Sequence, residues 1–333
     1  MPRVSVIMAV FQMAGKGSIL KKAVASIQKQ TLSDWELLIY DDGSTDHTLQ
    51  EVQRIVRGDS RIRVLYGPVN RKAGYARNRC IRAAKGRYLA IMDADDISEP
   101  DRLKVQADFL DAHPEYAFTG SSAWMFDNRG VWGLRTVEER PGRESFLSTL
   151  PFVHPSVMLR REAVLVLHGY REGPDSYRVE DYEFLMRMYA AGYRGYNIQK
   201  PLLRYREDAS AYRRRKYRYR ITECRMRLQG FTQLGILRGN VRYVLKPLAA
   251  GLVPAFVMQA ARAGRYRISR DGNRDKNTGK AVRKQRKGAS RPERKLYVQA
   301  DQQETVWKCR PERKLYGNAG RSARNRMETP AGQ

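Results

Sequence analysis

The stretch RYLAIMDADD, Arg87–Asp96, decides the fold prediction, because a short apolar run in it ends in three carboxylates. The run Arg87–Met92 is rich in bulky, β-prone residues and is typical of a buried strand. Asp93, Asp95 and Asp96 therefore lie at or just beyond the carboxyl end of that strand. In open α/β sheets, ligands bind outside the carboxyl ends of the strands. The sequence thus predicts a polar site at this point.

Two interpretations of the three carboxylates remain open. Neighbouring carboxylates repel one another unless one is protonated or a cation lies between them. Mg²⁺ and Mn²⁺ prefer oxygen ligands and keep one or two protein carboxylates, which leaves positions for phosphate oxygens and water. The alternative is an acidic turn that caps the next helix, because Ser98, Glu99 and Pro100 are typical of a helix start. On the triplet alone, the two interpretations are equally good.

The composition limits the possible partners and compartment. The chain has 333 residues, enough for one large domain or two modest ones, and a formal net charge of +28. Such a charge implies attraction to nucleic acid, an anionic membrane surface or a phosphorylated substrate. Cys80, Cys224 and Cys309 are too few and too widely spaced for a disulfide framework or a zinc cluster. Because a strand pattern, Val4–Val10, stands where a signal peptide would, we expect a cytoplasmic protein.

The charge is concentrated at the C-terminus. Residues 262–333 contain 21 Lys and Arg against 7 Asp and Glu, so their net charge of +14 is half of the total. The segment is poor in Ile, Leu, Val and Phe and cannot bury enough apolar surface to offset its ordering entropy. We therefore expect a disordered basic tail over residues 265–333. The sequence RPERKLY occurs twice in it, from Arg291 and from Arg310, and we assign this local duplication no chemistry.

Ahead of the tail, strand and helix patterns alternate, as in βαβ units with a mainly parallel sheet. The patterns predict strands and helices over residues 4–10, 19–27, 35–40, 48–56, 62–65, 75–84 and 87–92. A second acidic turn, Asp41–Asp46, follows the strand over residues 35–40. Because the carboxyl ends of parallel strands meet at one edge of a sheet, we expect the two acidic turns to share one site.

Four motifs occur in a fixed order, and together they carry a family resemblance. They are VSVIMAV from Val4, ELLIYDDGSTD from Glu36, AGYARNRCIRAAKGRYLAIMDADD from Ala73 and VEDYEF from Val179. Over about residues 4–208 the chain resembles the family 2 glycosyltransferases with a GT-A fold, and four ordered motifs are far more specific than the DAD triplet alone. A closer similarity, to bacterial exopolysaccharide glycosyltransferases of this family, begins at the HPSVMLRREA stretch from His154 and extends to residues 246–259.

The resemblance implies an α/β GT-A domain, Rossmann-like with a mainly parallel sheet flanked by helices, over residues 1–210. It implies transfer of a sugar from a nucleoside diphosphate sugar, with a UDP-sugar favoured. The acceptor would be a glycan or a lipid-linked molecule in exopolysaccharide or other cell-surface polysaccharide synthesis. The cofactor would be Mn²⁺ or Mg²⁺. The resemblance also implies an alternative, non-catalytic role, because one exopolysaccharide enzyme of this type acts as a brake on the flagellar motor and so has a motor protein as its partner.

The resemblance divides the carboxylates of the first motif among different roles. Asp95 is the main metal ligand, and Asp93 lies toward the ribose hydroxyls and the edge of the metal. A metal held there acts as a Lewis acid on the leaving diphosphate. Asp96 is left between orienting water on the metal and capping a helix. Many relatives have a metal-joining histidine where this chain reads LRYREDAS, so either Glu207 or Asp208 substitutes or the metal relies on Asp95, phosphate and water.

The second acidic turn supplies a candidate contact to the base. By resemblance, Asp42 accepts a hydrogen bond from the imide N–H of uracil or its equivalent in another base. The ordinary role of carboxylates and hydroxyls in such a turn is an Asx turn with helix capping. We favour that ordinary role for Ser44 and Asp46, and the ligand role for Asp42.

Three further residues are candidates for the nucleotide site. Arg77 matches the family's GxxxARN-like element, and its guanidinium either approaches the nucleotide or forms a salt bridge to an Asp across the sheet edge. Ala9 and Phe11 lie in the turn where the family contacts the base. Many relatives carry a Tyr-Asn pair there, so Val10 and Phe11 are a departure that leaves the nucleotide preference open.

The second half of the chain must supply the acceptor site and a base. Glu180 and Asp181 begin a helical pattern, where acidic residues are ordinary partners of the helix dipole. The resemblance instead makes Asp181 the general base that deprotonates the acceptor hydroxyl, with inversion, and Glu180 an orienting or capping residue. His154 precedes Pro155, so we expect it to be extended. It is a weaker candidate for an acceptor or phosphate contact, since a lone histidine is usually structural.

Residues 211–264 are predicted to be helical and membrane-interfacial. The YRRRKYRY stretch, Tyr212–Tyr219, mixes aromatic and basic residues, which suits single-stranded nucleic acid or anionic lipid headgroups. Leu248–Ala261 is apolar but too short to cross a bilayer, and Pro254 interrupts it. We favour peripheral attachment to the inner face of a membrane. We expect no specific nucleic acid, because carboxylates at a site repel phosphate unless a metal is present.

Overall fold

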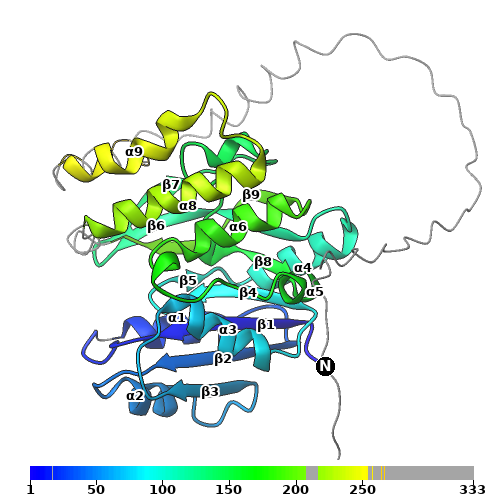
Figure 1. Ribbon diagram of the computed structural model, residues 1–333. Helices are drawn as coiled ribbons and strands as arrows, with labels where there is room; N and C mark the ends of the chain where they lie inside the picture. The colour runs from blue at the N-terminus through cyan, green and yellow to red at the C-terminus, as the bar shows by residue number, and fades with distance from the viewer. Residues whose placement is uncertain (17, 208–216, 254–256, 258–263, 265, 267–333) are drawn as a thin grey trace, which may run out of the picture. The chain divides into compact units, whose positions relative to one another are not determined.

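The computed structural model describes residues 1–16, 18–207, 217–253, 257, 264 and 266 (Figure 1). Its first compact unit spans residues 1–273. The predicted basic tail, apart from the single residue Tyr266, lies outside the described residues. So do Asp208 and most of the YRRRKYRY stretch. The division of the chain at residues 210 and 264 therefore stays a prediction.

Four parallel strands form the first half of the sheet, in the order β3-β2-β1-β4. Their bounds are Val4–Val10 for β1, Trp35–Asp42 for β2, Ile62–Gly67 for β3 and Tyr88–Asp93 for β4. The strands predicted from sequence are thus confirmed. β2 and β4 each continue into the first carboxylates of the acidic turns.

Beyond β4 the sheet is mixed. β8 (Met158–Arg160) pairs antiparallel with β4, and the order continues through β6 (Phe118–Asp127), β9 (Gly195–Arg206) and β5 (Ile97–Ser98). β9 runs parallel to β6, and β7 (Gly130–Arg135) pairs with β6 as an antiparallel partner. The C-terminal end of the long strand β9 lies beside the acidic turn that follows β4, because Leu203 and Arg204 pair there with the two residues of β5.

Helices cover both faces of the sheet (Figure 1). One face packs against α1 (Ile19–Gln28), α2 (Thr48–Ile55) and α4 (Arg102–Ala112), and the other against α3 (Ala73–Ala83), α5 (Arg161–Val166) and α6 (Glu180–Ala190). The alternation of strand side chains divides the core: Ile7 lies in the cluster with α3 and α6, whereas Val6 and Met8 lie in the cluster with α1 and α4. Each fully buried aliphatic side chain contributes about 1.5–3 kcal/mol. The predicted α/β class is confirmed.

The region after β4 differs from the expectation of an early helix start. Ile97–Ser98 form the short strand β5, and α4 begins only at Arg102. The backbone carbonyl of Pro100 accepts a hydrogen bond from the N–H of Thr31, so this segment is tied to the end of α1. The alternative interpretation, in which the carboxylates Asp93 to Asp96 cap the next helix, is wrong, because several residues of strand and turn separate them from that helix.

Two helices close the described chain. α8 (Arg218–Leu234) packs on α6 and ends at Gly235, whose φ of +72° is the left-handed conformation that glycine adopts without strain. α9 (Val241–Leu252) packs on α8 (Figure 1). The apolar segment predicted from Leu248 thus begins inside a helix that starts at Val241. None of the helices within the described residues is long and apolar enough to cross a membrane.

Candidate active site

The carboxyl ends of three parallel strands bring the two acidic turns together. In the register of the sheet, Ala9 at the end of β1 lies opposite Tyr40 of β2 on one side and Asp93 of β4 on the other. Val10 lies opposite Asp41. The expected shared edge therefore exists. Ala9 places only a small side chain between the two acidic strand ends.

Asp42 is buried and organises the loop that leads into α3. Its carboxylate accepts hydrogen bonds from the backbone N–H groups of Arg71, at 3.0 and 3.1 Å, and of Lys72, at 2.7 Å. Burial raises the pKa of this carboxyl, and the two backbone bonds oppose that effect. Lys72 has a φ of +76°, a strained conformation for a residue with a side chain, so the loop is held in place against its local preference. A carboxylate has about four acceptor positions, and the predicted contact to a base is compatible with these bonds.

The rest of the DDGSTD turn has the local role that the sequence indicated. Ser44 donates its hydroxyl to Asp41 Oδ1 at 2.5 Å, and Asp46 Oδ1 accepts the backbone N–H of Thr48 at 3.1 Å. The Ser44 hydroxyl also accepts the backbone N–H of Gln12, just beyond Phe11, at 2.9 Å. Ser44 thus joins the loop after β1 to the loop after β2, and Asp46 holds Thr48, the first residue of α2.

The three carboxylates after β4 have different surroundings. The pKa of Asp95 is raised to about 6 by burial and by the negative charge of Asp93. Asp96 is 1% exposed, and its pKa lies well above the usual range because it is buried beside Asp95 and Asp93. Asp96 Oδ1 accepts the backbone N–H of Arg206 on β9 at 2.8 Å, whereas Asp96 Oδ2 has no partner. Asp96 therefore anchors β9 to the acidic turn and does not cap a helix.

This arrangement fits a divalent cation whose coordination shell is completed by the phosphate oxygens of the substrate. Within the described part of the chain, no three or more His, Cys, Asp and Glu side chains gather into a metal-binding group. Mg²⁺ and Mn²⁺ do not need such a cage when one or two carboxylates, phosphate oxygens and water complete the coordination. Asp96 Oδ2 is buried without a hydrogen-bond partner, and the raised pKa values of Asp95 and Asp96 show that the carboxylates of this turn repel one another, a repulsion that a cation would relieve. Asp95 and Asp93 are the carboxylates that could hold the ion.

Arg77 joins the acidic turn after β4 to helix α6. Its Nη2 lies 3.0 Å from Asp93 Oδ1, and its Nη1 lies 3.3 Å from Glu180 Oε1, a residue 103 positions along the chain. The guanidinium is almost fully buried. Of the two interpretations of Arg77, the structure contains the salt bridge. The bridge brings the strand-end carboxylate and the first turn of α6 into one site.

The two carboxylates at the start of α6 differ in their partners. Glu180 shares the Arg77 guanidinium with Asp93, whereas the hydrogen bond that Asp181 accepts within the described part of the chain comes from the backbone N–H of Tyr182, at 2.8 Å from its Oδ1. Burial and the neighbouring charge of Glu180 raise the pKa of Asp181 to about 7. A general base works best with a pKa near the operating pH, so Asp181 has the electrostatics that the predicted role requires.

His154 is buried and is linked to Arg77 through Tyr170. It begins the 3-10 turn η2 (His154–Ser156), so the prediction of an extended residue was wrong: the backbone closes a turn between His154 and Val157. Its Nε2 lies 2.9 Å from the hydroxyl of Tyr170, and burial together with Arg77 lowers the pKa of the imidazole well below its usual value. His154 is therefore neutral and engaged with Tyr170.

Tyr170 and Asn78 are site residues that sequence reasoning missed. The Tyr170 ring lies 5.6 Å from the Arg77 guanidinium. Asn78, next to Arg77, donates to the backbone carbonyl of Tyr170 at 2.8 Å and accepts its N–H at 2.9 Å. The one sequence signal for this contact was the Asn of the ARN element, Asn78 itself. Asn78 also donates to Glu172 Oε1 at 2.8 Å. Tyr170 and Glu172 lie 92 and 94 residues from Asn78 in the chain, and no local sequence pattern reveals such distant partners.

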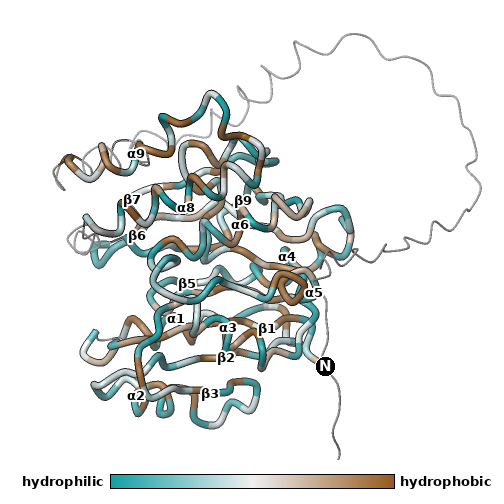
Figure 2. The backbone as a smooth tube through the Cα atoms, viewed as in Figure 1, coloured by the Kyte–Doolittle hydropathy of each residue, from teal (hydrophilic) through white to brown (hydrophobic). Residues whose placement is uncertain are grey.

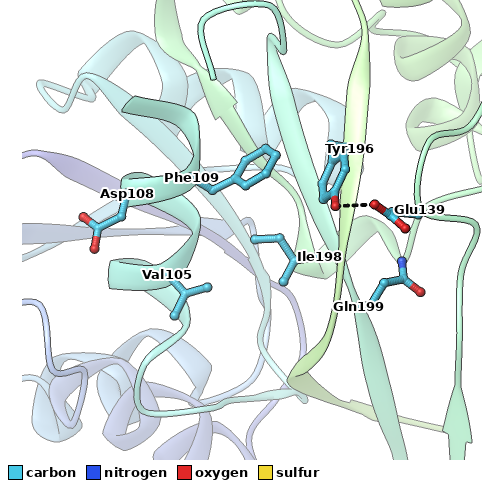
Figure 3. Close-up of a pocket in the computed structure, with 7 residues that line it drawn as sticks. All are labelled: Val105, Asp108, Phe109, Glu139, Tyr196, Ile198 and Gln199. Carbon is cyan, nitrogen blue, oxygen red and sulfur yellow. Dashed lines mark hydrogen bonds between the residues drawn. The ribbon is translucent and has the colours of Figure 1, made fainter. Parts of the chain in front are cut away.

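A surface hollow lies apart from the candidate site residues. It has a volume of about 510 Å³ and is lined by Val105, Asp108, Phe109, Glu139, Tyr196, Ile198 and Gln199 (Figure 3). The two faces of the Phe109 ring are covered by Tyr196 and by His113, at centroid distances of 4.5 and 4.4 Å. Tyr196 stands near the opposite end of β9 from Arg206, and none of the predicted site residues lines the hollow.

Comparisons of the sequence with known families agree with this architecture. Residues 5–166 match the model of glycosyl transferase family 2, and residues 88–268 match that of glycosyl transferase family group 2. The chain is 34% identical over 272 residues to the putative glycosyltransferase EpsE of Bacillus subtilis. That alignment covers 81% of this chain and 97% of EpsE.

Solved structures share the fold. The crystal structure of S. aureus TarS (residues 1–349) in complex with UDP-GlcNAc has a TM-score of 0.56 at 21% identity, covering 71% of this chain and 72% of TarS. The mannosyltransferase PcManGT of Pyrobaculum calidifontis, in complex with GDP-Man and Mn²⁺, has a TM-score of 0.52 at 18% identity, covering 79% and 80%. The chain therefore belongs to glycosyl transferase family 2, and it is a glycosyltransferase that transfers a sugar from a nucleotide sugar.

Proposed function

We propose that the donor is a UDP-sugar and that the reaction is inverting, assisted by Mn²⁺ or Mg²⁺. The observation that carries the proposal is the ion pair of Arg77 with both Asp93 and Glu180. It places the carboxylates at the strand ends, where nucleotides bind in such sheets, beside the carboxylates of α6. A donor and an acceptor can therefore meet in one site. UDP-GlcNAc in TarS and GDP-Man in PcManGT support a nucleoside diphosphate sugar as the donor, bound on the same fold.

We propose that Asp95 and Asp93 hold the cation and that Asp42 reads the base. The cation, when bound, stabilises the negative charge that develops on the departing diphosphate. Mn²⁺ in the PcManGT complex supports this choice of metal. Arg77 holds the Asp93 side chain in place through the ion pair of 3.0 Å between its Nη2 and Asp93 Oδ1. Ala9 and Phe11 complete the base side from the end of β1. Phe11 is exposed there and can cover an aromatic base.

We propose that Asp181 is the general base. The acceptor hydroxyl gives its proton to the Asp181 carboxylate while its oxygen forms a bond to the anomeric carbon. The bond between that carbon and the diphosphate breaks on the opposite side, and the configuration inverts. Glu180, held by Arg77, raises the proton affinity of Asp181 through its negative charge. His154 acts indirectly, because its hydrogen bond to Tyr170 positions the ring that lies against Arg77.

The acceptor is a glycan or a lipid-linked molecule in polysaccharide synthesis. This part of the proposal rests on the resemblance of the second half of the chain, from HPSVMLRREA onward, to exopolysaccharide enzymes. Acceptor faces are built from loops, and here the loop before α6 contains the 3-10 turn η3 (Pro174–Ser176) and Arg178 with a φ of +70°. The strained Arg178 lies two residues before Glu180 in the chain.

A panel of donors tests this proposal. We expect the full-length protein to release nucleoside diphosphate from a UDP-sugar in the presence of Mn²⁺ or Mg²⁺ and to stop when EDTA is added. The measurement is nucleoside diphosphate release from UDP-, GDP- and dTDP-sugars, each with and without metal. Preferential turnover of a GDP- or dTDP-sugar would overturn the choice of UDP. Turnover that is equal in EDTA would overturn the metal-assisted mechanism.

A further inference from the structure

Helix α9 exposes an apolar stripe. Val241, Leu245 and Leu252 lie on one helical face at spacings of four and seven residues, and they are 54%, 54% and 76% exposed. Val244 and Pro247 point inward and are buried against the rest of the chain. Figure 2 shows hydrophobic stretches recurring along this helix. A helix that buries one apolar face and exposes a second one has surface for a partner.

Helix α8, which packs against α9, also exposes apolar side chains. Ile221 and Leu228, seven residues apart, are also exposed. The two helices run alongside each other, and Gly251 near the end of α9 lies against the ring of Tyr217 at the start of α8. We call the exposed apolar side chains of the two helices, Ile221, Leu228, Val241, Leu245 and Leu252, the α8–α9 face.

The surroundings of the α8–α9 face are strongly basic. Residues 217–253 contain seven Lys and Arg but one acidic residue, Glu223. Glu223 is already neutralised by Arg220 at 3.1 Å and Arg227 at 3.0 Å. Arg242 and Lys246 directly follow Val241 and Leu245 and are exposed, so cations flank the apolar stripe.

We propose that the α8–α9 face binds an anionic lipid surface. An apolar stripe bordered by Lys and Arg is the pattern of helices that lie in the membrane interface, where the apolar side chains enter the acyl boundary and the cations meet headgroup phosphates. A second copy of this chain would bring two basic faces together, which is unfavourable. An acidic surface is therefore the partner that the charge favours. The proposal goes beyond the proposed reaction, because it needs neither the donor nor the metal.

Vesicle binding tests the proposal. We expect the full-length protein to sediment with vesicles of phosphatidylglycerol and phosphatidylcholine and to remain unbound with phosphatidylcholine alone. It should be released as salt rises from 50 to 300 mM, which shortens the screening length about 2.4-fold. The pair Leu245→Ser and Leu252→Ser keeps the charge unchanged and removes two apolar anchors. We expect this double variant to bind at least about tenfold more weakly.

The matched control is Leu165→Ser with Val166→Ser on α5, which are 41% and 65% exposed in the starting chain. We expect the control to bind like the unmodified protein, and both double variants to retain nucleoside diphosphate release in solution. Equal vesicle binding of the α9 variant and the control would overturn the proposal and assign the attraction to charge elsewhere. So would a concentration-dependent dimer that the α9 substitutions abolish. Failure of the donor assay alone would leave vesicle binding intact, so the two proposals fail separately.

Discussion

Replacing Asp181 by Asn lowers kcat by roughly 10²–10⁴-fold and leaves the affinity for nucleoside diphosphate near that of the unmodified protein. The amide keeps the size of the carboxyl group but cannot take the proton of the acceptor hydroxyl. Steady-state turnover measures kcat, and calorimetric titration with UDP and Mn²⁺ measures the affinity for the nucleoside diphosphate. Asp175→Asn, an exposed carboxylate in η3 a few residues earlier, is the control and should behave like the unmodified protein. Comparable losses in both variants would remove Asp181 from the role of base.

The pH dependence follows from the raised pKa of Asp181. Below about pH 7 the side chain is protonated and cannot act as a base, so we expect kcat to fall as the pH drops through that value. The sign for stability is opposite. Because the folded pKa lies above the ordinary value of 3.8, the folded state binds more protons than the unfolded state between these values, and stability is lost as the pH rises through this window. Asp181→Asn removes that cost and should melt no lower than the unmodified protein at pH 8.

Replacing Asp95 by Asn should damage both binding and turnover. Asp95 is the main carboxylate proposed to hold the metal, which when bound would contribute several kcal/mol of charge stabilisation to the departing diphosphate, and the amide of the variant would hold the metal poorly. We therefore expect kcat/KM to fall at least about a hundredfold and the Mn²⁺-dependent gain in UDP affinity to disappear. Isothermal titration with UDP, with and without Mn²⁺, measures that gain directly.

The control for Asp95 is Asp108→Asn on α4, whose carboxylate pairs with Arg3 and Lys104 away from the site. It should retain the metal-dependent gain in affinity. If UDP binds the Asp95→Asn variant as tightly with Mn²⁺ as it binds the unmodified protein, the assignment of Asp95 as the main metal ligand is wrong.

The strands and the shared sheet edge could be predicted because their signals are local. The apolar runs before Asp41 and Asp93 identify buried strands, and the order of strands and helices then requires the two acidic turns to meet. The distinct roles within the second turn also followed from local chemistry. A hydroxyl or carboxylate that bonds the backbone two or three residues away, as Asp46 bonds Thr48, depends only on its neighbours.

The contacts that assemble the site could not be predicted because they join distant segments. Arg77 and Glu180 are 103 residues apart, and Asp96 and Arg206 are 110 residues apart. The role of Asp96 therefore stayed open between orienting water on the metal and capping a helix, since the β5 pairing that displaces the helix depends on β9. The start of α9 was missed for a local reason, because Pro247 lies inside the helix, where proline ordinarily breaks it.

The configuration of the first product tests the central claim most directly. That claim is that Asp181 takes the proton of the attacking hydroxyl while the bond between the anomeric carbon and the diphosphate breaks on the opposite face of the sugar. In the absence of acceptor, water takes the place of the hydroxyl, and proton NMR during hydrolysis of an α-linked UDP-sugar reports the anomer before it equilibrates. The account predicts that the β-anomer forms first. An α-anomer as the first product would contradict direct displacement and the assignment of Asp181 as its base.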